Sequence, residues 1–220
     1  MDKDFFLYDI LSKTSNLVLA INIILYFKRY RKNSIAFKIF TNYLLFIFII
    51  QLVSGYLRLN KENNLYLSHY YFIGQFIFLS LFYLFSEKKK LFKNGIRIIL
   101  LLGLVSIGIY YLKNPQAYFS FNLFEIAITS IPLILFSFYF FIKKIDSDNH
   151  KFIYLNSGFF LYVSCSTLLF SAGNINSSIK NIIWYSNLVL YLLYQLLVFI
   201  EWYKNFRKPL KKISSKRFSL

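Results

Sequence analysis

The sequence has few cysteines, histidines and acidic residues. Its single cysteine, Cys165, excludes a disulfide framework and any metal site built from several thiolates. Charged residues make up only 16% of the 220 residues, against about 25% in an average soluble domain. Apolar residues reach 57%, with 27 Phe and 19 Tyr, and so many aromatics also exclude a disordered chain. The composition therefore indicates an integral membrane protein.

Seven apolar segments are long enough to cross a bilayer as helices, which takes about 20 residues each. The predicted spans are residues 6–28, 38–58, 65–86, 95–113, 120–143, 151–173 and 181–203. They are too long for barrel strands and show no alternation of apolar and polar residues. We therefore predict an all-α, polytopic seven-helix bundle over residues 1–203 and a basic tail over residues 204–220. In the first span, Asp9 and Lys13 lie four residues apart and are expected to pair along the helix.

The distribution of lysine and arginine predicts the orientation of the bundle. If the N-terminus is outside, 20 of the 26 basic residues lie in cytoplasmic loops and in the tail. This satisfies the positive-inside rule and predicts the N-terminus outside and the C-terminus inside. Asp2 and Asp4 precede the first span and a basic run at 28–32 follows it. That order differs from a secretory signal peptide, so we expect the first span to be retained.

The net charge of +17 would suggest nucleic acid as a partner of a soluble domain. Here it is explained by topology and by attraction to anionic lipids of the inner leaflet. We expect these lipids as partners, and a protein partner at the basic cytoplasmic face, but no nucleic acid. The abundance of Lys, Asn, Ile, Phe and Tyr is typical of an AT-rich bacterial genome, which predicts a multi-pass protein of a bacterial inner (plasma) membrane.

Polar side chains inside the predicted spans gather towards the outer side. Ionisable groups within a span usually face the bundle interior and are candidates for function. Asn122, Glu125, Thr129 and Pro132 share one helical face of the fifth span. We predict an outward-facing polar pocket near the outer ends of several helices. Its candidate ligand-binding residues are Glu125, His69, Gln51, Gln75, Arg58, Asn187 and Tyr191.

Each of these residues also has a purely structural interpretation. Glu125 would then pair with Arg58 or Lys13, and His69 would contact headgroups or water at the interface. Gln51 and Gln75 would only form hydrogen bonds between helices, each contributing about 0.6 kcal/mol.

Several chemistries are excluded by what the spans lack. His69 and His150 are predicted on opposite sides of the bilayer and cannot bind one metal together. Residues 182–203 contain no lysine for the Schiff base of a retinal protein. No GxSxG, HExxH, phosphate-loop or CxxC motif occurs. We expect no metal, no other cofactor and no catalytic residue.

The predicted arrangement resembles the compact membrane portions of bacterial seven-helix sensors. The resemblance lies in the architecture: an outer N-terminus, short loops, an outer polar pocket and a basic cytoplasmic face. It implies a small sensor or receptor-like module that signals to a separate partner, with proton sensing through His69 as one variant. Two alternatives remain open: a non-catalytic subunit of a larger membrane complex, and an intramembrane lipid-acting enzyme with Glu125 and His69 as its acid–base pair.

Overall fold

A computed structural model describes residues 3–120, 122–145, 147–173 and 180–207. Within these residues the chain forms seven α-helices and no β-strand. The helices are α1 (Lys3–Phe27), α2 (Ile35–Leu59), α3 (Leu67–Ser86), α4 (Lys90–Lys113), α5 (Leu123–Ile145), α6 (Ile153–Gly173) and α7 (Lys180–Glu201). Three short helical segments accompany them: η1 (Tyr30–Lys32), η2 (Pro115–Phe119) and the π-helical η4 (Trp202–Phe206).

Each of the seven predicted segments coincides with a helix, although some ends differ. α4 begins at Lys90 rather than at residue 95, because its basic first turn continues the helix beyond the apolar run. α5 begins at Leu123 rather than at residue 120, since the Asn122 side chain caps its start. The pair in α1 is confirmed: Lys13 Nζ lies 2.6 Å from Asp9 Oδ2. Of the predicted tail, residues 208–220 lie outside the described residues.

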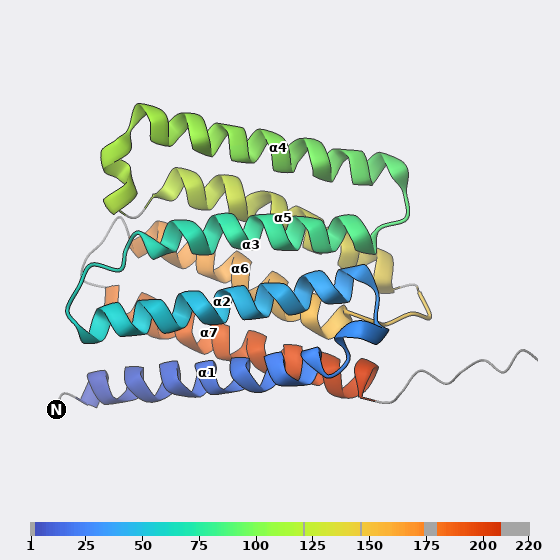
Figure 1. The fold of residues 1–220 in the computed structure, drawn as a ribbon, viewed down its shortest axis with the longest axis horizontal. Coiled ribbons are helices and arrows are strands. Elements are labelled where there is room, and N and C mark those ends of the chain that lie inside the picture. The colour runs from blue at the N-terminus through green and yellow to red at the C-terminus, as the bar shows by residue number, and fades with distance from the viewer. Residues whose placement is uncertain (1–2, 121, 146, 174–179, 208–220) are drawn as a thin grey trace, which may run out of the picture.

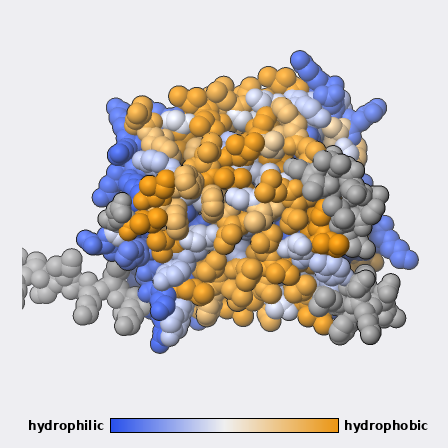
Figure 2. Space-filling view, turned by 180° about the vertical axis from the view of Figure 1, so that it is seen from behind, coloured by the Kyte–Doolittle hydropathy of each residue, from blue (hydrophilic) through white to orange (hydrophobic). Residues whose placement is uncertain are grey.

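Six of the helices are long and apolar enough to cross a membrane. α6 is also a helix of 21 residues, but the apolar stretch found among its described side chains is shorter, Ile153–Leu169. Figure 2 shows hydrophobic side chains across the middle of one face and hydrophilic ones towards its two ends. This pattern indicates a multi-pass membrane protein.

Successive helices run in opposite directions, so the loops gather at two ends of the bundle (Figure 1). We call the end with residues 60–66 and 114–122 the His69 end. The opposite end, with residues 28–34, 87–89, 147–152 and 202–207, is the basic end, because Lys and Arg are concentrated there.

Six helices form a closed ring in which α1 packs on α2, then α3, α5, α6 and α7 follow, and α7 returns to α1. α4 lies outside this ring against α3 and α5 (Figure 1). The core inside the ring is strongly aromatic, and its largest fully buried side chains include Tyr43, Tyr83, Phe82 and Phe159. Since α4 is not part of the ring, α3 and α5 are direct neighbours although α4 separates them in the sequence.

Ionisable side chains join α3 and α5 at both ends of the bundle. His69 Nδ1 lies 2.9 Å from Glu125 Oε2, and Lys143 Nζ lies 2.5 Å from Glu87 Oε1, just after α3. In both pairs the partners are 56 residues apart, so the two parallel helices keep one register. At 1.5 Å per residue, the 18 residues from position 69 to position 87 span about 27 Å. That length is close to the thickness of a bilayer core, about 30 Å.

Candidate functional site

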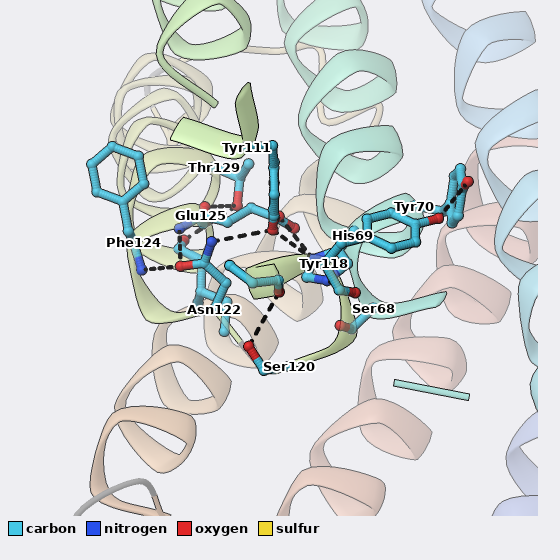
Figure 3. A network of polar contacts seen from close by, with 12 residues as sticks. Ser68, His69, Tyr70, Tyr111, Tyr118, Ser120, Asn122, Phe124, Glu125 and Thr129 are labelled. Carbon is cyan, nitrogen blue, oxygen red and sulfur yellow. Dashed lines mark hydrogen bonds and ion pairs between the residues drawn. The ribbon is translucent and has the colours of Figure 1, made fainter. Parts of the chain in front are cut away.

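His69 lies in the first turn of α3, and both of its ring nitrogens have partners (Figure 3). Nδ1 faces Glu125 Oε2 at 2.9 Å, and Nε2 lies 2.9 Å from the backbone carbonyl oxygen of Tyr118. The residue is only 3% exposed. His69 therefore connects α3 to the start of α5 and to η2, with both ring nitrogens bonded within the protein.

Glu125 is positioned by the start of α5. Asn122 Oδ1 accepts hydrogen bonds from the backbone N–H groups of Phe124 (3.0 Å) and Glu125 (3.4 Å), as an N-cap residue does. Glu125 consequently lies in the first turn, where the helix dipole favours a negative charge. Its side chain is 1% exposed, and Oε1 has no hydrogen-bond partner among the described residues.

Tyr111, near the end of α4, completes the cluster. Its hydroxyl donates a short hydrogen bond to Glu125 Oε2 and lies 2.8 Å from His69 Nδ1. Asn122 Nδ2 donates to the same hydroxyl at 3.1 Å. The peripheral helix α4 is thus joined to α3 and α5 by polar contacts at this end.

Tyr118, in η2, covers His69. Its ring stacks on the imidazole with 5.4 Å between the ring centroids and 29° between the planes. The hydroxyl lies 2.8 Å from that of Tyr70, and this hydrogen bond, with some burial, raises the pKa of Tyr118 to about 12. Because Tyr118 closes the site, a ligand larger than a proton or a water reaches the imidazole only if η2 moves.

The hydrogen-bond partners restrict the protonation states of the His69–Glu125 pair. Nε2 faces a carbonyl oxygen, which only accepts, so Nε2 carries a proton. A proton between Nδ1 and the Glu125 carboxyl group would complete their 2.9 Å contact. The pair is either imidazolium with carboxylate or neutral imidazole with carboxylic acid, and both forms have zero net charge. Gain or loss of one proton would leave a net charge in a buried site.

The other predicted ligand-binding residues lie elsewhere. Gln75 Nε2 donates to the Tyr43 hydroxyl at 2.9 Å in the core, and Asn187 Oδ1 accepts from Ser166 Oγ at 2.7 Å. Tyr191 is buried, and its hydroxyl has no partner among the described residues. Of the predicted set, only Glu125 and His69 are joined directly to each other by a hydrogen bond among the described side chains.

The two remaining residues of that set are on α2. Gln51 is half-buried, and Arg58 is exposed with its guanidinium 5.4 Å from the centre of the Tyr8 ring. The alternative in which Glu125 pairs with Arg58 or Lys13 is wrong, because Glu125 pairs with His69 and Lys13 with Asp9. The structural interpretation of Gln75 holds, by contrast, because its amide does form a hydrogen bond between helices.

Sequence reasoning missed three members of the cluster as site residues: Tyr111, Tyr118 and Asn122. Asn122 was placed on the Glu125 face, and an asparagine three residues before a glutamate is itself a capping pattern. Tyr111 and Tyr118 resemble the aromatic residues common at membrane interfaces. Tyr118 contributes a backbone carbonyl, which its residue type does not reveal.

Neither a metal centre nor a similar protein explains the cluster. Among the residues with described placement, no group of three or more His, Cys, Asp or Glu side chains could hold a metal ion. Comparisons with protein-family models, with curated proteins and with solved structures find no match to this chain. The chemistry of the site therefore has to be argued from its own geometry.

Proposed function

We propose that this chain is a sensor or receptor-like membrane module whose sensing site is the His69–Glu125 cluster. Its N-terminus and the His69 end face the outside of a bacterial inner membrane, and the basic end faces the cytoplasm. The positive-inside distribution of Lys and Arg supports this orientation. The signal is passed to a separate protein at the basic end.

The closed geometry of the cluster favours the proton as the sensed species. Histidine is the side chain whose charge ordinarily changes between pH 5 and 8. The His69–Glu125 pair holds one shared proton, is 1–3% exposed, and touches no further charged group within ion-pair distance among the described side chains. A second proton, or loss of the first, leaves an uncompensated buried charge, and breaking a buried pair costs about 3–5 kcal/mol.

The structure offers a route by which such a charge is relieved. η2 is held over the imidazole by the Tyr118 carbonyl and by ring stacking, so its displacement admits water to the pair. Movement of α5 relative to α3 at the His69 end also acts on the Glu87–Lys143 pair at the basic end. A difference in proton affinity between two packings of α3 and α5 is sufficient to shift their populations.

Distance measurements between spin labels test this proposal. Cysteines replace Phe119 on η2 and Tyr56 on α2, both well exposed, in a Cys165→Ser background, and the full chain is placed in lipid vesicles. We expect the distance distribution to change between pH 8 and pH 5, and this change to be lost in His69→Gln. Asp9→Asn, which breaks an exposed ion pair on α1, is the control and should retain it. Equal pH responses in all three proteins would contradict the proposal.

The orientation has its own test. Lys61→Cys at the His69 end and Arg31→Cys at the basic end are compared for labelling of intact cells by a membrane-impermeant maleimide. We expect labelling of position 61 only. Labelling of position 31 alone would reverse the orientation and place the cluster on the cytoplasmic side.

A second candidate is an intramembrane enzyme acting on lipid, which the 2.9 Å contact between His69 and Glu125 favours. This distance is within the reach that general acid–base catalysis requires. A lipid substrate must first displace Tyr118 from the imidazole. Mass spectrometry of lipids incubated with the wild type and with Glu125→Gln distinguishes the enzyme from the sensor. Lipid turnover that depends on Glu125 indicates an enzyme, whereas unchanged lipids support the sensor.

A further inference from the structure

The basic end contains a cavity that the proposed sensing site does not use. Its volume is about 310 Å³, and it lies between η1, the start of α2, the ends of α3 and α5, residues 149–152 and η4. Sites for small molecules commonly measure about 300–1,000 Å³, so this cavity has room for a small headgroup. It lies at the opposite end of the bundle from His69.

Three lysines line the cavity: Lys32, Lys144 and Lys151. Among the described residues none of them has a carboxylate within 4.0 Å, since the ion pairs found are Lys13–Asp9, His69–Glu125 and Lys143–Glu87. Lys144 Nζ donates one hydrogen bond, to the Asn149 carbonyl oxygen at 2.8 Å. An ammonium group carries three donors, so this bond leaves capacity for an anion.

Two of the carboxylates described at this end are already engaged, and the third, Asp148, is exposed and forms no ion pair with a described residue. Glu87 binds Lys143, and Glu201 is fully buried and accepts hydrogen bonds from the backbone N–H groups of Phe152 and Tyr154. Neither can neutralise the three cavity lysines without losing its own partners. The cavity is therefore a concentration of positive charge.

The rest of the cavity wall combines apolar side chains with the polar residues Asn33, Ser34, Ser86 and Asn149. Phe85, Phe140, Phe152 and Phe206 contribute rings, and the ammonium groups of Lys144 and Lys151 lie 5.6 Å and 5.9 Å from the centres of the Phe140 and Phe206 rings. Ser86 Oγ is buried and has no hydrogen-bond partner within the described chain. A hydroxyl without a partner, beside cations and rings, suits a ligand that combines an anion with an apolar part.

We infer that this cavity binds a phosphate-bearing anion, with the phosphate held by Lys32, Lys144 and Lys151 and the remainder of the molecule against the phenylalanines. A phosphate presents several acceptor oxygens, which matches three lysines and a serine hydroxyl better than a single carboxylate would. The phosphate can come from the headgroup of an anionic lipid or from a soluble phosphate. The rings and the position at the ends of apolar helices favour the lipid.

Native mass spectrometry of the full chain tests this inference, with phosphatidylglycerol and phosphatidylcholine as lipid probes. We expect phosphatidylglycerol to bind more tightly than phosphatidylcholine, which has a phosphate but no net charge. Removing the three cavity charges in K32Q/K144Q/K151Q should weaken that binding on the order of a hundredfold, at about fivefold per lysine. The arginine triple variant at the same positions should restore it.

A charge-matched control separates the cavity from the general charge of this end. K88Q/K89Q/K90Q removes three exposed lysines that do not line the cavity, and should bind phosphatidylglycerol as the wild type does.

Inorganic phosphate is the third probe. If it displaces the lipid from the wild type, the site also accepts soluble phosphate; if it does not, the source of the phosphate is the lipid. Equal losses in the two glutamine triple variants, or equal binding of both lipids, would overturn the inference. None of these variants touches His69, so the outcome is independent of the sensing proposal.

Discussion

Glu201, in the last turn of α7, accepts a 2.6 Å hydrogen bond from the backbone N–H of Phe152, directly before α6 begins. Its second oxygen accepts from the Tyr154 N–H at 3.1 Å, and Asn205 Nδ2 donates to the first at 2.7 Å. The end of one helix thus caps the start of its neighbour with a fully buried carboxyl group. This contact joins α6 to α7 at the basic end of the bundle.

Glu201→Gln should therefore loosen the start of α6. The amide keeps the size of the side chain but replaces one acceptor oxygen with a donor that faces a backbone N–H. An unsatisfied buried group costs about 1–3 kcal/mol, which should appear as a lower unfolding midpoint and faster hydrogen exchange at residues 152–154. Glu62→Gln, in an exposed loop, is the control and should change neither. Unchanged exchange at the start of α6 in Glu201→Gln would show that the cap contributes nothing.

The His69–Glu125 pair should show strong thermodynamic coupling. His69→Phe leaves the Glu125 carboxyl without the imidazole, and Glu125→Leu leaves Nδ1 of the imidazole without the carboxyl group. We expect each single variant to lose about 3–5 kcal/mol of unfolding free energy, whereas the double variant, with an apolar pair in the same place, loses less than the sum. Equilibrium unfolding in detergent measures all four corners of the cycle. Additive losses would mean that the two side chains do not interact.

The fold follows from the sequence more completely than the site does. Helix positions are encoded by runs of apolar residues, which need no knowledge of neighbours, so each predicted segment coincides with a helix. The order of the helices in the ring is not encoded locally in this way. How side chains from distant segments fit together decides that α3 packs on α5 and that α4 lies outside. His69 and Glu125 were both candidates from their types alone, because ionisable groups are rare inside apolar helices.

The limits of sequence reasoning are clearest at Tyr118 and Gln75. Tyr118 acts on His69 through its backbone carbonyl and the stacking of its ring, and both depend on the path of η2. The pocket predicted from the sequence includes Gln75 as well as His69, yet the Gln75 amide binds Tyr43 on α2. Helical spacing tells which face a residue shares with others, but which neighbour that face meets is decided by packing.

The Glu87–Lys143 pair should make stability depend on acidic pH. Burial alone would raise the pKa of Glu87, but the hydrogen bond from Lys143 and those from the Lys88 and Lys89 N–H groups outweigh it and lower the pKa below 4.5. When a carboxyl group has a lower pKa in the folded than in the unfolded state, it stabilises the protein at pH values above its unfolded-state pKa. This stabilisation is lost as the pH falls through the folded-state pKa. The difference in unfolding midpoint between wild type and Glu87→Gln should therefore be largest above pH 4.5 and shrink below it. Parallel curves for the two proteins would contradict this assignment.

Close approach of α2 and α3 at Gly74 gives a matched pair of substitutions. A Cβ atom at Gly74 would clash with the ring of Phe46, whereas nothing lies within 4 Å of one at Gly55. Gly74→Ala should lose about 1–3 kcal/mol of unfolding free energy through overpacking. Gly55→Ala should be neutral or gain about 0.5–1 kcal/mol, because alanine favours the helix more than glycine does.

The phenylalanine that blocks Gly74 also provides the decisive variant. Phe46→Leu shortens the side chain that a Cβ would meet, so adding it to Gly74→Ala should recover part of the lost stability, although Phe46→Leu alone is destabilising. Such compensation is typical of groups in contact, whereas the effects of distant substitutions add. If Gly74→Ala is as well tolerated as Gly55→Ala, or if Phe46→Leu makes it worse, then α2 and α3 do not approach each other at Gly74 and Phe46. The Gln75–Tyr43 hydrogen bond, which joins the same two helices one residue further along α3, would then have to be lost as well.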